Sequence, residues 1–118
     1  SNTYNKELVK FFKKIKCKIT LIKVYETIKV KKLNKSVIKN LRAVNFSSAV
    51  FFSKFSLEVF FELCRSEKIS RSSLKKIQYI CISQRVSEFA ANRGFSVHYP
   101  SNPFEQSIYE LIKQLKLK

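Results

Sequence analysis

One pattern occurs twice in this chain, and its two copies lie thirty residues apart. Each copy is an apolar run that ends in a serine and is followed at once by a stretch with helical spacing: residues 49–53 read AVFFS, and residues 79–83 read YICIS. Such a copy predicts a buried strand, a serine N-cap and an amphipathic helix. Two of these strand–helix units in succession favour a parallel sheet with helices packed against it.

The two serines, Ser53 and Ser83, are expected along one edge of that sheet, because both follow the carboxyl end of a strand. Ligands of open α/β folds bind outside the carboxyl ends of the strands, and helix N-termini suit anionic groups. The sequence therefore predicts a binding site for an anionic ligand at this edge. Each serine is also explained by a purely structural role as an N-cap.

The bulk composition bounds the class of protein. A length of 118 residues with 45% hydrophobic residues is enough for one domain with a real core, or for part of a larger protein. No apolar stretch reaches the length of a transmembrane helix and no signal peptide is visible, so no membrane span and a cytoplasmic location are expected. Cys17, Cys64 and Cys81 have no CxxC spacing and are expected to be reduced, mostly buried thiols. With one histidine and no aspartate, neither a metal site nor a Ser-His-Asp triad is expected.

The net charge of +16 is large and uneven. Residues 1–42 hold 13 Lys and Arg against 2 Glu, and residues 43–118 hold 11 against 6. A basic field of this size favours polyanions, such as nucleic acid, an anionic membrane or a polycarboxylate substrate. A lysine-, isoleucine- and asparagine-rich composition also follows from an AT-rich coding sequence without selection for binding, and both interpretations stay open.

The remaining segments continue the alternation of helices and strands. Helices are expected over residues 4–16, 36–44, 54–64 and 84–94 and from residue 103 to the C-terminus; strands are expected over residues 19–27, 46–52, 77–82 and 95–99. Residues 65–75 are polar and serine-rich and are interpreted as a loop. This order predicts an α/β fold, with a parallel sheet of about four strands and helices on both faces, flavodoxin-like in general plan.

Two further details of the helices are predicted. The helix over residues 84–94 is expected to bury Val86, Phe89 and Ala90 and to end at Gly94, which suits the left-handed region. The last helix is expected to begin at Asn102, with Pro103 in its first turn. The chain also opens on a helix with no strand before it, which indicates that a preceding segment is missing.

The ordered series of motifs resembles the C-terminal half of the uroporphyrinogen-III synthase family. The series consists of VYET at residues 24–27, AVFFS with its helix, ICIS with a helix ending in glycine, and YPSNP with the last helix. No single motif is highly specific, but the ordered set covers residues 5–116 approximately, nearly the whole chain. The resemblance implies two flavodoxin-like domains joined by a two-stranded linker, with the N-terminal half of the family's chain absent here.

On that pattern the chain has three parts. Residues 1–17 correspond to the helical tail of the family's second domain, residues 18–27 to the returning linker strand, and residues 28–118 to most of the first flavodoxin-like domain. The implied reaction closes hydroxymethylbilane, a polycarboxylate, into uroporphyrinogen III with inversion of ring D and loss of water, in tetrapyrrole and heme biosynthesis. It implies an enzyme that needs no cofactor and no metal.

The resemblance also implies roles for individual residues. Tyr25 matches a tyrosine that faces the family's cleft and is proposed to protonate the departing hydroxyl group, which is chemically reasonable for a phenol. Thr27 lies on the same face of that strand and is a weaker candidate for substrate binding. A tyrosine that merely packs at a strand end is the alternative.

Four residues at the strand ends are candidates for binding the carboxylates of the substrate: Ser53, Lys54, Ser83 and Arg85. Lys54 stands where proline is frequent in the family, and Arg85-Val86 stand where some members carry a threonine pair, so the hydroxyl group that those members use is absent. Arg85 can pair with a carboxylate instead. A solvated surface arginine is the alternative.

Two other functions remain open at this point. One is a basic nucleic-acid-binding α/β module, which the scattered lysines and the absence of a recognised motif disfavour. The other is an inactive, truncated synthase fragment, because half of a cleft between two domains would be missing. Two copies of the chain could then associate by exchanging their N-terminal helices.

Overall fold

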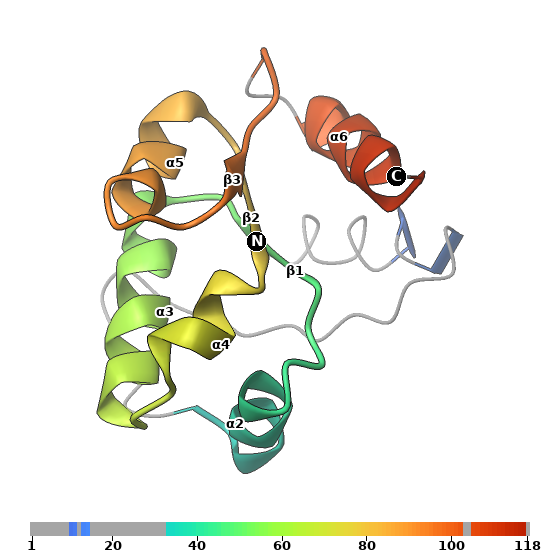
Figure 1. The fold of residues 1–118 in the computed structure, drawn as a ribbon. Coiled ribbons are helices and arrows are strands. Elements are labelled where there is room, and N and C mark those ends of the chain that lie inside the picture. Colours follow the sequence, from blue (N-terminus) through green and yellow to red (C-terminus); the bar gives the residue numbers. More distant parts are fainter. Residues whose placement is uncertain (1–9, 12, 15–32, 103–104, 118) are drawn as a thin grey trace.

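The computed structural model of the chain describes residues 10, 11, 13, 14, 33–102 and 105–117 (Figure 1). The predicted strand over residues 19–27, which carries Tyr25 and Thr27, lies outside the described residues, and so does Cys17. The predicted fourth strand therefore stays a prediction.

The described residues form an α/β fold with a parallel sheet, as predicted. The elements are α2 (Lys35–Arg42), β1 (Ser48–Phe51), α3 (Lys54–Ser66), α4 (Arg71–Lys75), β2 (Gln78–Cys81), α5 (Gln84–Ala91), β3 (Val97–His98) and α6 (Glu105–Leu117). The sheet has three strands in the order β1-β2-β3, and both neighbouring pairs are parallel. Val50 pairs with Ile80, so the two copies of the repeated pattern lie side by side in matching register.

The alternation of side chains along the strands divides the core into two layers. Phe51 and Tyr79 belong to the main apolar cluster, which α2, α3, α4 and α5 cover, whereas the neighbouring residues Val50 and Ile80 belong to a second cluster under α6. This division follows from the period of two in a strand. In Figure 1, α6 accordingly lies on the other side of the strands from α3 and α5. Helices cover both faces of the sheet, as predicted.

The interpretation of residues 65–75 as a loop is wrong in part. α3 continues to Ser66, and a short helix, α4, begins after Ser70. The hydroxyl oxygen of Ser70 accepts the backbone N–H of Ser73 at 3.1 Å. α4 was missed because its single buried apolar residue, Leu74, is too little to establish a helical period. It is nevertheless held in place, since Leu74 belongs to the main cluster.

The ends of three helices share one backbone geometry. Gly94 has a φ of +87°, and the N–H groups of Gly94 and Phe95 donate to carbonyls of the last turn of α5 at 3.0 and 3.1 Å, as expected for a Schellman motif. A Cβ atom at Gly94 would lie 2.8 Å from Arg71 Nη2, but that end of the arginine side chain can move, so the positive φ is the reason for glycine here. α2 and α3 end in the same left-handed way at Val44 (φ +55°) and Lys68 (φ +56°), without glycine.

Both cysteines of the described residues are free and fully buried, as predicted. Burial raises the pKa of the Cys64 thiol from 9.0 to about 12 and that of the Cys81 thiol from 9.0 to about 11. In the unfolded chain the two thiols lose their protons near pH 9, but in the folded chain they keep them. The contribution of the two buried thiols to the free energy of unfolding is therefore complete below pH 9. It is lost as the pH rises toward the native pKa values.

We expect the free energy of unfolding to fall by about 1.4 kcal/mol for each thiol between pH 8 and pH 10, because one pKa unit corresponds to that energy. Urea unfolding at the two pH values measures the change. Cys64→Ala and Cys81→Ala should each remove about half of the thiol contribution to the pH dependence. A dependence that is the same in wild type and both variants would contradict the assignment.

Candidate functional site

The two serines of the repeated pattern lie at the same edge of the sheet. Phe51 pairs with Cys81, and the N–H of Ile82 donates to the carbonyl of Phe51 at 3.0 Å. Ser53 and Ser83 each follow two residues after this pair, so they leave neighbouring strands at equivalent positions. The predicted meeting of two helix N-termini at the carboxyl edge is thus found.

Both serines act as N-caps. Ser53 Oγ accepts the backbone N–H of Ser56 at 3.1 Å and shares a second hydrogen bond of 2.9 Å with Ser56 Oγ. Ser83 Oγ accepts the backbone N–H of Val86 at 3.3 Å. Both serines are half-buried. The structural role is confirmed, and the contact of these hydroxyl groups with a ligand stays a prediction.

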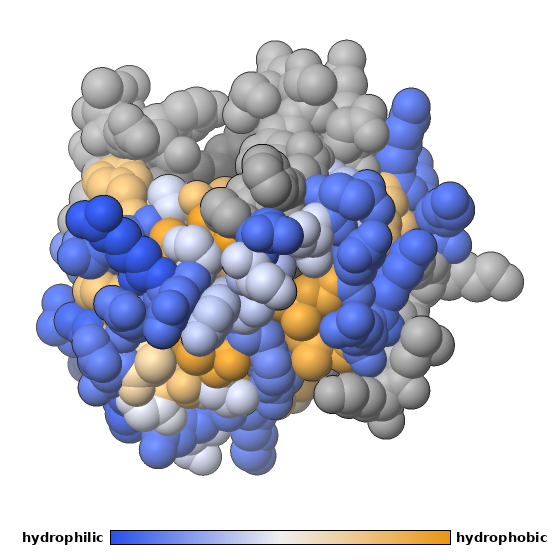
Figure 2. All heavy atoms as spheres, turned by 90° about the horizontal axis from the view of Figure 1, so that it is seen from above, coloured by the Kyte–Doolittle hydropathy of each residue, from blue (hydrophilic) through white to orange (hydrophobic). Residues whose placement is uncertain are grey.

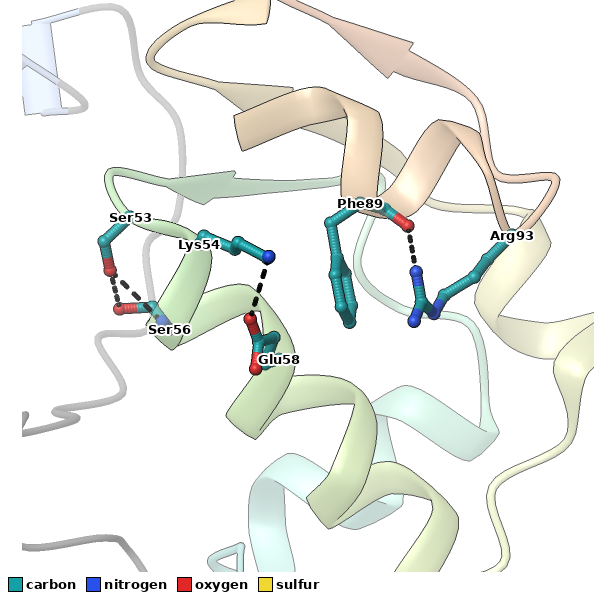
Figure 3. A network of polar contacts seen from close by, with 6 residues as sticks. All are labelled: Ser53, Lys54, Ser56, Glu58, Phe89 and Arg93. Carbon is teal, nitrogen blue, oxygen red and sulfur yellow. Dashed lines mark hydrogen bonds and ion pairs between the residues drawn. The ribbon is translucent and has the colours of Figure 1, made fainter. Parts of the chain in front are cut away.

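The cationic candidates Lys54 and Arg85 lie in the first turns of α3 and α5, and both are exposed. Lys54 Nζ lies 3.7 Å from Glu58 Oε1, with the two side chains 63% and 45% exposed (Figure 3). An exposed pair of this kind contributes only about 0–1 kcal/mol. The ammonium group of Lys54 is thus only weakly held by Glu58 and can interact with an acidic ligand.

Lys54 and Arg85 meet at an open hollow of about 380 Å³ between α3 and α5. Its lining residues are Lys54, Arg85, Glu88, Phe89, Asn92 and Arg93. The structure therefore brings the two predicted cations together and adds a third, Arg93, which the sequence reasoning missed. The spacing of Phe89 and Arg93, which places them on one helical face, was the available signal.

Phe89 differs from its predicted role as a core residue of α5. It is only half-buried and packs against the edge of the main cluster, and the same holds for Val86, whereas Ser87 is the buried polar residue of this helix at 2% exposed. Ser87 can be buried because its hydroxyl group donates to the carbonyl of Gln84 at 2.7 Å. Ala90 is fully buried, as predicted.

The predictions about a metal site and a membrane span can be compared with the described residues only. In that part of the chain, no group of three His, Cys or Glu side chains could hold a metal ion, and no helix is long and apolar enough to cross a membrane. Seen from above in Figure 2, hydrophilic side chains cover most of the described surface, and apolar ones are visible between them. Tyr25 and Thr27 lie outside the described residues, so their place beside Ser53 and Ser83 stays a prediction.

Comparisons with known proteins identify one family. The family model described as uroporphyrinogen-III synthase HemD matches residues 1–110, which is nearly the whole chain. Neither a curated protein nor a solved structure gives a match.

Proposed function

Because the chain belongs to the uroporphyrinogen-III synthase family, we propose that it closes hydroxymethylbilane to uroporphyrinogen III, with inversion of ring D and loss of water. Membership of the family supports a function in tetrapyrrole biosynthesis. The observation that carries the finer proposal is the pair of serine-capped helix N-termini on neighbouring parallel strands. In this proposal residues 28–118 form one domain of a two-domain enzyme, and the substrate binds against its carboxyl edge.

The proposed binding step uses groups at the ends of β1 and β2. The first N–H groups of a helix have no partner within the helix and carry partial positive charge, so they suit a carboxylate. Ser53 and Ser83 each lie at the start of such a helix. Their hydroxyl groups can add hydrogen bonds to the same carboxylate. Lys54 and Arg85 supply the opposite charge from the same two first turns.

The proposed chemical step is the departure of the substrate's terminal hydroxyl group as water. A neutral phenol at Tyr25 would donate its proton to that oxygen while the carbon–oxygen bond breaks, which avoids the release of hydroxide. Thr27 would bind the substrate from the same strand. The resulting carbocationic carbon would then be attacked by ring D at the ring carbon that already carries its bridge. That bridge bond would break and form again at the free carbon of ring D, which inverts the ring. The proton that this free carbon loses balances the one that Tyr25 donates, so the net change is the loss of one water.

The product isomer tests the proposal directly. The chain is incubated with hydroxymethylbilane, and the uroporphyrinogen that forms is oxidised and separated into its isomers. Formation of the III isomer faster than in buffer supports the proposal. Closure only to the isomer without inversion, at the rate seen in buffer, would contradict synthase activity of this chain.

We expect two substitutions of Ser53 to separate its cap role from its proposed role in binding. Ser53→Ala should lower the free energy of unfolding by about 1 kcal/mol, and Ser53→Gly by only a few tenths. Both remove the hydroxyl group and should raise KM for hydroxymethylbilane to the same extent, roughly tenfold for one hydrogen bond to a charged group.

Ser70 provides the matched control, because it caps α4 through the same contact, to the N–H of Ser73 at 3.1 Å. Ser70→Ala and Ser70→Gly should change stability and leave KM unchanged. If KM follows stability across all four variants, Ser53 is a cap only.

A further inference from the structure

The hollow between α3 and α5 extends along α5, from the first turn of that helix to beyond its last turn. Its lining residues include Arg85 in the first turn of α5 and Arg93 after the last turn. These two positions span the whole length of the helix, about 12 Å at a rise of 1.5 Å per residue. A ligand group bound near Arg93 would therefore be separate from one bound at the caps.

Arg93 is held in place before any ligand arrives. Its guanidinium carbon lies 3.6 Å from the centroid of the Phe89 ring, and its Nη1 donates to the Phe89 carbonyl at 2.8 Å (Figure 3). The stacking and the hydrogen bond fix the plane of the guanidinium group. An anion that binds to Arg93 then loses little side-chain entropy, which favours affinity.

A second cation approaches the same aromatic ring. Lys54 Nζ lies 6.0 Å from the Phe89 centroid, and in Figure 3 the ring stands between the Lys54 ammonium and the Arg93 guanidinium. Two carboxylates oppose them, since Glu88 lines the hollow and Glu58 pairs with Lys54. With Arg85 included, three cations still outnumber two acids at this place.

We infer that this hollow is a second carboxylate-binding subsite, which takes a side-chain carboxylate of the polyacidic substrate while another carboxylate lies at the serine caps. The inference rests on the proposed function for the identity of the substrate. Only Nη1 of Arg93 donates to the Phe89 carbonyl. The other N–H groups of this planar guanidinium match a carboxylate in geometry as well as in charge. The amide of Asn92, which also lines the hollow, can add a hydrogen bond.

Citrate, a small polycarboxylate, serves as the probe in a calorimetric titration of the whole chain at low salt. Arg93→Gln should weaken citrate binding roughly tenfold, because Arg93 lines the hollow. Arg65→Gln should change citrate binding less than about twofold, because Arg65 only contributes to the net charge. Glu58→Gln should tighten binding by about threefold, since it releases Lys54 from its ion pair. This gain cannot result from a folding defect.

Equal weakening by both arginine variants would overturn the subsite, because citrate would then respond only to net charge. An unchanged or weaker affinity in Glu58→Gln would also overturn it. Circular dichroism melting of each variant checks that Arg93→Gln remains folded at the temperature of the titration.

Turnover of hydroxymethylbilane tests whether the anion is the substrate. Arg93→Gln should raise KM and leave kcat unchanged, as expected for an interaction made equally in the ground and transition states. If citrate binding falls but KM does not change, the hollow binds free anions and is not a substrate subsite, while the proposed function stands. If the wild type forms no uroporphyrinogen III yet binds citrate as described, the proposed function fails and the assignment to this substrate fails with it.

Discussion

Replacing Tyr79 with alanine is expected to destabilise the fold by about 4 kcal/mol, the range for removing a large buried aromatic side chain. Tyr79 is fully buried at the centre of the main cluster, with its ring 5.3 Å from Phe95 and 5.4 Å from Phe61 between centroids. Its hydroxyl group donates to the carbonyl of Leu74 at 2.8 Å, which connects β2 to α4. Because domains of this size have only about 5–15 kcal/mol of stability, this loss should lower the midpoint of unfolding markedly.

Urea unfolding measures the effect, and two controls separate its causes. Tyr79→Phe keeps the ring and should cost about 1 kcal/mol, because it removes one buried hydrogen bond while the Leu74 carbonyl keeps the backbone N–H of Ile77 at 3.3 Å. Tyr99→Ala removes the same side chain from a position that is 41% exposed and should change stability by less than about 0.5 kcal/mol. Similar losses in Tyr79→Ala and Tyr99→Ala would contradict the central place of Tyr79.

Replacing Tyr25 with phenylalanine is expected to lower the turnover of hydroxymethylbilane roughly 10- to 100-fold, the lower part of the usual range for acid–base groups. Phenylalanine keeps the ring but has no proton to donate to the departing hydroxyl group. KM should stay near that of the wild type, since the proposed proton transfer belongs to the transition state. Steady-state rates of formation of uroporphyrinogen III give both parameters.

Tyr99→Phe is the matched control, because it removes the same hydroxyl group from an exposed position. Its turnover should equal that of the wild type. An unchanged rate in Tyr25→Phe would assign Tyr25 to packing, and a raised KM with unchanged kcat would assign it to substrate binding without proton transfer.

The parts of the fold that could be predicted are those that depend on neighbours in the chain. A short continuous apolar run, followed by a serine and a stretch with helical spacing, was enough to predict β1 and β2, their parallel pairing and the caps at Ser53 and Ser83. The left-handed backbone at Gly94 was predictable for the same reason, because only local steric effects select glycine there. Among the candidate site residues, Lys54 and Arg85 were found because they follow directly from these caps.

The features that could not be predicted depend on contacts between residues far apart in the chain. α4 forms because Leu74 is buried against other elements and its carbonyl accepts a hydrogen bond from the Tyr79 hydroxyl group. Residues 71–75 contain no periodic pattern that predicts a helix. Arg93 became a site residue only when α5 packed beside α3, which placed Lys54 near the ring on which Arg93 stacks.

The sequence by itself thus determined the order of all the described strands and helices except α4, and which edge of the sheet carries the two capping serines. Only the tertiary structure decided which cations share one hollow and which tyrosine the core is built around. The physical reason is range: hydrogen bonds at helix ends and the alternation of side chains involve residues within a few positions of one another. The packing of one helix against another depends on the shapes and volumes of all the side chains between them.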